Sequence, residues 1–517
     1  MSDAEPFRII VVGGGTAGWL TVAYLARMLS ADLYDGAKIS IIEAPDIDPI
    51  GVGEGTFPSI RKTLSLIGIE EELLFREADA TFKQGIRFVD WTREGHKYYH
   101  LFHPADRPGG LDLLPYWLLG EAGDQPWSAV CNVQSRVVDA ALGPKPVGAA
   151  PSGELAYAFH FDAIAMAGVL RRFAEPFVTR IEDKVRTVHL TADGSVESLE
   201  TERSGMLRGD LFIDCTGFRA EIIGKAMGIP WTSCRDQLFV DRAVTIGVPH
   251  SSPMSQLPSC TIATAKDAGW IWDIALRRRR GVGYVYSSGH CSDTAALAVL
   301  ENYVGGWTGE PRLIRFDTGY RKVQWHKNCV AVGLSAGFLE PLEATGIGLV
   351  ESAIRHLVAA FPWDRQFDAV ARVFNEQMNR RFRNIIDFIK LHYCTSGRRD
   401  SSFWIENTDS RTASASLMEK LSQWRYRPPG FIDIDYSCDT FIEENWRQVL
   451  YGMEFRTDLS ARRSAFRFFE EARRSFSRVQ TQGAMAAQML PPHRHLVESI
   501  CVGARAARVA KTEVPEG

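Results

Sequence analysis

The chain has 517 residues, a formal net charge of −4, 45% hydrophobic residues and 24% charged residues. This balance is ordinary for a globular protein, and it argues against a nucleic-acid partner. The nine cysteines include no C-x-x-C pair, which favours reduced thiols over disulfides and argues against a metal site. The chain shows neither a signal peptide nor an apolar run long enough to span a bilayer, so we expect a cytoplasmic protein without membrane contact.

The N-terminal residues carry a nucleotide-binding pattern. A buried strand is expected over residues 7–12, followed by the glycine turn Gly13-Gly-Gly-Thr-Ala-Gly18, a helix to about residue 30 and a strand that ends in Glu43. In such a βαβ unit the glycines allow a tight turn and close approach of a pyrophosphate, and the acid binds a ribose hydroxyl. The interval to Glu43 is longer than usual, and we assign the extra length to the loop over residues 32–37.

A second glycine-rich loop, Gly51-Val-Gly-Glu-Gly55, precedes a helix expected near Pro58. A strand is expected over residues 81–91, with Phe82 on one face and Lys83 on the other. A lysine in such a strand usually faces solvent, so Lys83 by itself predicts no site. The next strand-like run, over residues 98–102, has a histidine and aromatic residues that fit core packing equally well.

The middle of the chain alternates helical and strand patterns. A helix is expected to begin over residues 160–163 and to end near residue 174, and strands are expected over 184–190 and 210–215. Strands over 268–274 and 283–288 are expected to pair antiparallel, and Trp270 and Trp272 then share one strand face. Between them, Arg277-Arg-Arg-Arg280 suits either a phosphate patch or a solvated loop.

The segment over residues 338–348 combines acids with a helix start. It follows a strand-like run over 329–334, places Glu340 and Glu343 before an amphipathic helix, and opens that helix with Thr345 and Gly346. First-turn N–H groups have no partner within a helix, and glycine lets an ion approach them closely. The segment therefore suits an anion site, although a plain helix cap with acids favoured by the dipole explains it as well.

Residues from about 366 onward show mostly helical patterns, for example over 374–391 and 462–479, interrupted at Pro428-Pro-Gly430. With the βαβ unit and the antiparallel strands, this predicts a mixed α/β fold whose C-terminal part is helical.

Taken together, these segments resemble the flavin-dependent tryptophan halogenases. The resemblance runs from Gly13 to beyond Trp446 and rests on motifs that occur in one order. They are Gly13-Gly-Gly-Thr-Ala-Gly-Trp19, Ile50-Gly-Val-Gly-Glu54, Phe82-Lys83, Tyr99-His100-Leu-Phe102, Phe212-Ile-Asp-Cys215, Trp270-Ile-Trp272-Asp-Ile274, the segment 338–346 and Ser401-Ser-Phe-Trp404.

The resemblance implies an α/β (α+β mixed) fold with two parts. Residues 1–365 are expected to form the catalytic module, which joins an FAD module of the glutathione-reductase or p-hydroxybenzoate-hydroxylase type to a mixed substrate-side sheet. Residues 366–517 are expected to form a mostly helical subdomain that caps the substrate side.

The family's chemistry, carried onto this chain, uses FADH₂, O₂ and bromide or chloride. Reduced FAD captures O₂ as a hydroperoxide, and a halide held at Thr345 and Gly346 attacks it to give hypohalous acid. This acid travels through the interior to Lys83, which orients it by a hydrogen bond or holds it as a haloamine. Glu343 then stabilises and deprotonates the cationic intermediate formed on the aromatic ring.

The resemblance also assigns binding roles. Trp270 and Trp272 line the flavin side and keep the organic substrate away from the flavin, and the substrate ring is expected to contact His100, Phe102 and Trp446. The cofactor-binding residues implied are Gly13, Gly15, Thr16, Ala17, Gly18, Glu43, Gly53, Val185 and Leu334.

The sequence departs from the family pattern in three places. Ala275 stands where a proline usually ends the tryptophan motif, and Ala344 stands where a serine often follows the catalytic glutamate. The third departure concerns the tyrosine pair, glutamate and phenylalanine at the site that clamps the amino-acid end of tryptophan. In a gap-free alignment on Trp446 these positions hold Ile434, Asp435, Phe441 and Asn445, and Tyr436 lies one place off. We therefore expect free indole, or another indolic or phenolic ring, in preference to free tryptophan.

Two other functions remain open on sequence alone: a flavin-dependent aromatic monooxygenase, and a catalytically silent flavin-binding protein. Lys83, Glu343 and the tryptophan pair argue against both. No second nucleotide fingerprint is present, so FADH₂ is expected from a separate NAD(P)H-dependent flavin reductase. We expect a monomer or homodimer.

Overall fold

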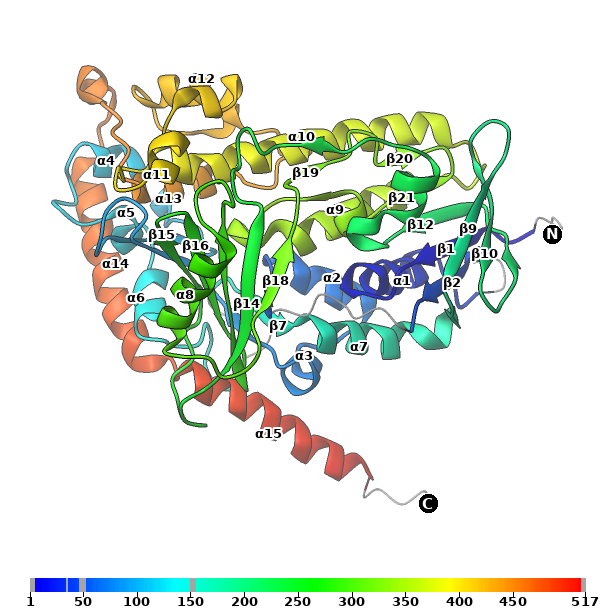
Figure 1. Ribbon diagram of the computed structural model, residues 1–517. Coiled ribbons are helices and arrows are strands. Elements are labelled where there is room, and N and C mark those ends of the chain that lie inside the picture. The colour runs from blue at the N-terminus through cyan, green and yellow to red at the C-terminus, as the bar shows by residue number, and fades with distance from the viewer. Residues whose placement is uncertain (1–4, 34–35, 46–52, 149–154, 513–517) are drawn as a thin grey trace.

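The computed structural model describes residues 5–33, 36–45, 53–148 and 155–512, except for the side chains of residues 503–512. Figure 1 shows a mostly parallel sheet near the N-terminus, a large antiparallel sheet beside it, and long helices along the outside. This mixed α/β architecture with a helical C-terminal region confirms the predicted fold class. Within those ranges, no helix is both long enough and apolar enough to cross a membrane.

The parallel sheet is built on the N-terminal βαβ unit. The side chains of β1 alternate between two core clusters, with Ile9 and Val11 on one face and Ile10 and Val12 on the other. The first face packs beneath helices, and the second packs against a small sheet. The parallel sheet has the order β20 (Trp325–His326), β21 (Cys329–Ala331), β12 (Leu211–Asp214), β1 (Arg8–Val12), β2 (Lys38–Glu43) and β8 (Thr179–Glu182), with β20 antiparallel to β21.

Helix α1 (Thr16–Met28) follows β1 as predicted and contacts α7 (Ala163–Ala174) and α9 (Thr345–Ala359). Helices α2 (Ser59–Ile67) and α3 (Glu71–Glu77) pack beside them. The small sheet on the opposite face consists of β11 (Met206–Leu207), β10 (Val196–Thr201) and β9 (Val185–Leu190).

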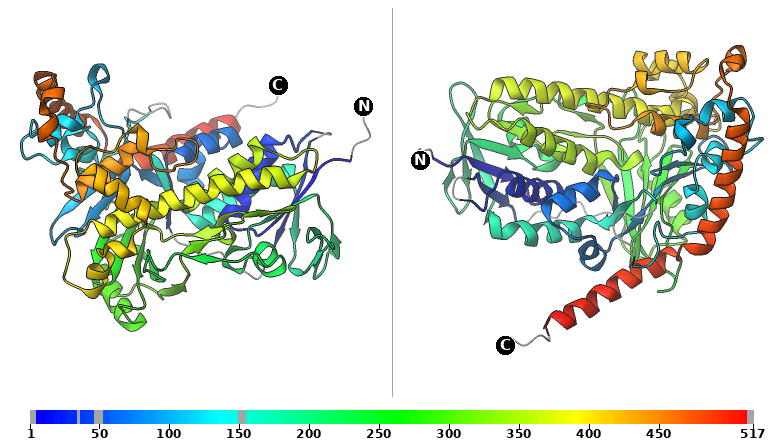
Figure 2. Two further views of the ribbon diagram at one scale, coloured as in Figure 1. Left: turned by 90° about the horizontal axis from the view of Figure 1, so that it is seen from above. Right: turned by 180° about the vertical axis from the view of Figure 1, so that it is seen from behind.

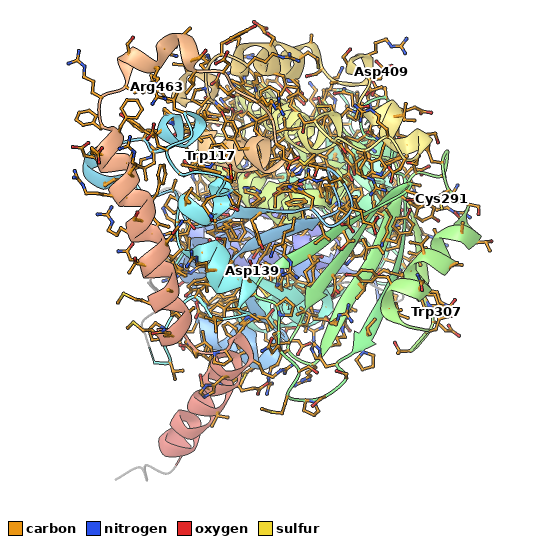
Figure 3. The ribbon with its side chains drawn as sticks, turned by 90° about the vertical axis from the view of Figure 1, so that its left-hand side faces the viewer. Trp117, Asp139, Cys291, Trp307, Asp409 and Arg463 are labelled. Carbon is orange, nitrogen blue, oxygen red and sulfur yellow. The ribbon has the colours of Figure 1, made fainter. Side chains whose placement is uncertain are left out.

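The large antiparallel sheet carries the tryptophan motif. Strand β16 pairs antiparallel with β17, as predicted, and Trp270 and Trp272 lie 6.4 Å apart by ring centroid. Figure 3 shows Trp117 and Arg463 near α14 on one side of this sheet, and Cys291 and Trp307 beside α8 (Asp293–Val304) on the other. The sheet has the order β18 (Arg312–Arg315), β14 (Arg242–Pro249), β17 (Arg279–Tyr286), β16 (Gly269–Ala275), β15 (Thr261–Lys266), β5 (Gly85–Val89) and β6 (Lys97–Leu101), and all of its pairs are antiparallel except β15 with β5, which is parallel.

The single strand predicted over residues 81–91 is wrong, because the chain forms two strands in two sheets. Strand β4 (Thr81–Lys83) pairs with β7 (Ala158–Asp162), whereas β5 joins the large antiparallel sheet. The change occurs at Gly85, whose φ of +148° favours glycine, and a Cβ there would lie 2.3 Å from the carbonyl oxygen of His100. Strand β3 (Gly53–Gly55) pairs with β7 on the other side.

Two helix boundaries also differ from the prediction. His160 belongs to β7, and α7 begins only at Ala163, because Asp162 caps the helix by accepting from the N–H groups of Ile164 and Ala165. The helix predicted over 462–479 begins later, at Phe469, after a short 3₁₀ turn.

The C-terminal helices run over both sheets, and α10 lies along α9 and contacts α13 (Figures 1 and 2). Helix α15 extends away from the body at the C-terminus, as both views show. The C-terminal helices are α10 (Phe367–Cys394), α11 (Ser402–Asn407), α12 (Ala415–Trp424), α13 (Glu443–Gly452), α14 (Phe469–Met489) and α15 (His493–Thr512), and short helices α4 (Leu114–Leu118), α5 (Trp127–Val130) and α6 (Gln134–Asp139) lie near α13 and α14.

Candidate active site

The turn before α9 has an unusual backbone. Glu343 and Ala344 both have positive φ angles, +70° and +54°, which non-glycine residues rarely adopt. Such strained residues cluster at functional sites, where the surrounding structure holds them in place. The turn delivers the chain into α9 at Thr345, as predicted, and leaves the Glu343 side chain buried.

The start of α9 fits the predicted halide site. Among the described residues, no side chain caps this helix and no acid occurs in its first turn. A Cβ at Gly346 would meet nothing within 4 Å, so space is open beside the backbone. Unpaired N–H groups at the positive end of a helix, next to open space, can hold a small anion.

Glu343 is held by two histidines from different elements. Nδ1 of His100, on β6, lies 2.5 Å from Oε2, and Nε2 of His392, on α10, lies 3.0 Å from Oε1. The far side of each ring is also engaged: Asn445 Nδ2 lies 2.8 Å from His100 Nε2, and the Tyr98 hydroxyl lies 2.6 Å from His392 Nδ1. The Asn445 amide and the Tyr98 hydroxyl are donors there, which leaves each ring an N–H that points toward Glu343.

These contacts decide the charge of Glu343. Burial would raise the pKa of this carboxyl, but the electrostatic effect of His100 and the close contacts of both histidines outweigh it and hold the pKa well below its usual range. Burial lowers the pKa of His392, which favours its neutral, hydrogen-bond-donating form. The site therefore holds an ionised carboxylate in an interior position.

Lys83 is fully buried, against the solvent-facing position that a lysine usually takes. Its Nζ lies 5.3 Å from the ring centroid of Phe102 and 5.6 Å from that of Phe57, and it has no hydrogen-bond partner among the described residues. Burial lowers the pKa of Lys83 to about 8, although Glu343 acts in the opposite direction. The ammonium form therefore predominates at neutral pH, beside a minor neutral fraction.

Lys83 and the turn before α9 meet at one glycine. A Cβ placed on Gly55 would come within 3.1 Å of Lys83 Nζ and 3.4 Å of the Ala344 Cβ. Gly55 therefore leaves room between the lysine and the turn. Ala344 stands where the resemblance places a serine, so the turn offers no side-chain hydroxyl at this position.

A second buried glutamate supports the tryptophan pair. Glu340 Oε2 accepts hydrogen bonds from Trp270 Nε1 at 3.0 Å and from the Tyr393 hydroxyl at 2.6 Å. Burial raises the pKa of Glu340 to about 7, because these two donors only partly offset it. A Cβ at Gly283 would lie 2.2 Å from the ring of Trp272, so the glycine makes space for that side chain.

The three residues predicted to contact the substrate are not equally close to Glu343 and Lys83. His100 contacts Glu343 directly, and Phe102 lies beside Lys83. Trp446 is fully buried, with its ring 4.9 Å by centroid from Phe388. Phe388 and Phe441 stack at 3.8 Å, and each of these two rings neighbours His100.

The glycine turn after β1 fits a dinucleotide. Gly13 has a φ of +116°, and a Cβ there would lie 2.2 Å from the Cys215 carbonyl oxygen. A Cβ at Gly15 would meet nothing within 4 Å, and no described side chain caps α1, so its first N–H groups are available to a pyrophosphate. The predicted residues Gly13, Gly15, Thr16, Ala17 and Gly18 all lie at this turn.

The remaining predicted cofactor residues lie on separate elements. Glu43 ends β2 beside Gly14, and its carboxylate accepts from Arg180 Nε at 2.9 Å. Val185 begins β9, Leu334 lies in the 3₁₀ turn after β21, and Gly53 begins β3. Residues 50–52 of the second glycine-rich loop lie outside the described residues.

The arginine run does not form a phosphate patch. Each of its four arginines faces an acid, and those acids come from separate parts of the chain. Their positive charge is therefore matched locally. The pairs are Arg277–Glu498, Arg278–Asp79, Arg279–Asp162 and Arg280–Asp273.

Sequence reasoning missed several partners of the site. His392 and Tyr393 are consecutive in α10, and each holds one of the two glutamates. Asn445 was seen only as a departure from the family, yet it orients His100. The alternation of apolar and polar residues in α10 gives no sign of these contacts, because they depend on where the helix crosses the turn before α9.

Comparisons with known proteins agree on one family. A family model described as tryptophan halogenase matches residues 8–467. Tryptophan 6-halogenase SttH from Streptomyces toxytricini is 34% identical over 454 residues, which cover 83% of this chain and 86% of SttH. Tryptophan 7-halogenase RebH from Lentzea aerocolonigenes is 34% identical over 496 residues, covering 89% and 91%. A crystal structure of tryptophan halogenase from Shewanella frigidimarina superposes with a TM-score of 0.91 at 37% identity, covering 96% of this chain and 98% of that one.

Proposed function

Since the chain belongs to the tryptophan halogenase family, a group of flavin-dependent enzymes, we propose that it halogenates an indole-like aromatic ring through Lys83 and Glu343. The enzyme is a flavin-dependent halogenase that uses FADH₂, O₂ and chloride or bromide. When bound, the reduced flavin supplies with O₂ and halide the hypohalous acid that carries the electrophilic halogen. The glycine turn after β1 would hold the pyrophosphate of the flavin cofactor, and the start of α9 would hold the halide.

Lys83 has the properties that a halogen carrier needs. Its Nζ is buried, has no hydrogen-bond partner among the described residues, and lies over the rings of Phe57 and Phe102. An ammonium form donates a hydrogen bond to hypohalous acid, and a neutral amine can react with it to give a haloamine and water. A pKa of about 8 makes both forms accessible near neutral pH.

Glu343 has the properties of the base. Addition of the halogen makes the ring cationic, and the final step removes a proton from the ring carbon. A fixed carboxylate stabilises that positive charge and accepts the proton. The single observation that carries the assignment is the pair of histidine contacts, because they keep Glu343 ionised and oriented where burial alone would neutralise it.

The substrate end of the site favours a ring without an amino-acid group. In the gap-free register on Trp446 the clamp positions hold Ile434, Asp435 and Phe441, and Asp435 is engaged by Arg380 at 3.2 Å. Tyr436 is 59% exposed and donates its hydroxyl proton to Glu443. These contacts support free indole, or a related indolic or phenolic ring, over free tryptophan.

The test offers indole and tryptophan side by side, with FAD, an unrelated NADH-dependent flavin reductase in place of the enzyme's own reductase, and bromide or chloride. Mass spectrometry then detects the halogen isotope pattern. Halogenated indole with little halogenated tryptophan is the expected result. Equal product from tryptophan would refute the substrate assignment, and hydroxylated product without halogen would indicate a monooxygenase.

A further inference from the structure

Strand β4, which carries Lys83, has one edge that no other strand covers in the described fold. Lys83 pairs with Ala158 of β7, so β7 covers the other edge. On the uncovered edge, the backbone N–H of Phe82 donates to Nε2 of His493 at 3.0 Å. His493 is the first residue of α15, more than 400 positions along the chain. The C-terminal segment therefore takes the place of a neighbouring strand beside the lysine.

His493 uses both of its ring nitrogens. Nδ1 donates to the Leu257 carbonyl oxygen at 2.9 Å, and Nε2 accepts from Phe82. Only a neutral ring with its proton on Nδ1 satisfies both partners. The side chain is fully buried, and burial lowers the pKa of His493 to about 4, so this form persists near neutral pH.

The same network also holds the residue on the other side of Lys83. Gln84 donates from its backbone to the Ser259 carbonyl oxygen at 2.7 Å and from its side chain to the Leu142 carbonyl oxygen at 2.9 Å. Leu142 in turn bridges to Pro492, next to His493. Both neighbours of Lys83 are thus anchored, while its own Nζ has no partner among the described residues.

We propose that His493 is a positioning residue for Lys83: by holding the Phe82 N–H, the C-terminal segment sets where the amine lies relative to the rings of Phe57 and Phe102. A buried side chain without its own hydrogen bonds depends on its backbone for its place, and a misplaced reactive group loses much of its rate. The inference rests on the role proposed above for Lys83.

The test uses the full-length chain with two substitutions. His493→Phe keeps a ring of similar size but removes both hydrogen bonds, whereas His493→Gln keeps an acceptor and a donor. His189→Phe, on β9, is the matched control for loss of a histidine. The first readout needs no flavin: reductive methylation of Lys83, measured by peptide mass spectrometry across a pH series.

In the wild type we expect Lys83 methylation to rise with a midpoint near pH 8, as its pKa of about 8 requires. In His493→Phe we expect the midpoint to move up by about one pH unit or more, because the released amine gains water. His493→Gln is expected to stay near the wild-type midpoint. An unchanged midpoint in folded His493→Phe would overturn the proposal. If His493→Phe does not fold, His493→Leu, which also lacks both hydrogen-bonding atoms, replaces it, with a shift of the same sign expected.

The second readout separates positioning from flavin chemistry. Halogenated product per NADH consumed is expected to fall about 10-fold or more in His493→Phe, as for other residues that orient an active group, while released hypohalous acid persists or rises. The proposed role of Lys83 and its positioning by His493 are tested by different results. Full activity of Lys83→Ala would refute the role of the lysine. An unchanged methylation profile in His493→Phe would refute the positioning.

Discussion

Glu340 and Glu343 lie three positions apart in one turn, and both are buried, yet their charges differ. Glu343 faces a histidine at each oxygen, and its pKa is held well below the usual range. Glu340 receives two neutral donors at a single oxygen, and its pKa is raised to about 7. Burial pushes both pKa values upward, so the difference comes from the partners.

The comparison separates a reacting carboxylate from a supporting one. An ionised carboxylate can take a proton from the substrate ring, whereas a carboxyl with a pKa of about 7 is protonated about half of the time near neutral pH and does so less efficiently. Glu340 instead orients Trp270 and Tyr393, and it contacts neither histidine in the described structure. The residue pattern of the segment gives the two glutamates equal standing, and only the family resemblance distinguishes Glu343.

The largest expected effect comes from removing the lysine that works with Glu343. Lys83→Ala should lower halogenated product by about 100-fold or more, because the carrier of the halogen is lost while the base remains. FAD binding should be unchanged, since the glycine turn after β1 lies on another element. The assay is mass spectrometry of product together with a flavin-binding titration. Activity within about threefold of wild type would exclude the assigned role.

A smaller effect is expected from the residues that hold the two glutamates. His392→Phe should lower activity by about 10-fold and shift the acid limb of the pH–rate profile upward, because Glu343 loses a contact that lowers its pKa. Tyr393→Phe, the adjacent change, removes a donor from Glu340 only. The acid limb of the pH–rate profile of Tyr393→Phe should therefore stay at the wild-type position. An identical shift in both variants would contradict the division between the two carboxylates.

The smallest effect on activity is expected from Glu340→Gln, which should instead change how the free energy of unfolding depends on pH. The pKa of Glu340 rises from 4.5 to about 7 on folding, so between these pH values the folded protein keeps a proton that the unfolded chain has lost. The free energy of unfolding should therefore fall as pH rises through this window, by on the order of 3 kcal/mol from this group. Glu340→Gln should lack that slope in urea unfolding across the window. An unchanged slope would show that Glu340 is ionised throughout.

Much of the fold was predictable from local pattern. The βαβ unit, the antiparallel pair that carries Trp270 and Trp272, and the helix start at Thr345 all follow from periodicity and glycine placement. The strand over residues 81–91 was mispredicted, because β-type residues continue through a place where the backbone turns at Gly85. The alternation of apolar residues does not indicate that β4 and β5 pair with different strands.

The candidate site residues came from motifs. Lys83 and Glu343 were identified through the resemblance, although burial of the lysine reverses the general expectation for that residue type. His392 and His493 were missed because a lone histidine in a helix has no local signal. Their functions come from contacts across the chain, to Glu343 and to the Phe82 backbone. Such contacts depend on tertiary packing.

The most direct test of the account compares Glu343→Gln with Glu340→Gln in the same halogenation assay. The two changes are chemically identical, equally buried and three residues apart. The account predicts that Glu343→Gln loses about 100-fold or more of the product while still binding FAD and releasing hypohalous acid, and that Glu340→Gln stays within about threefold of wild type. Equal losses in both variants, or retained activity in Glu343→Gln, would contradict it.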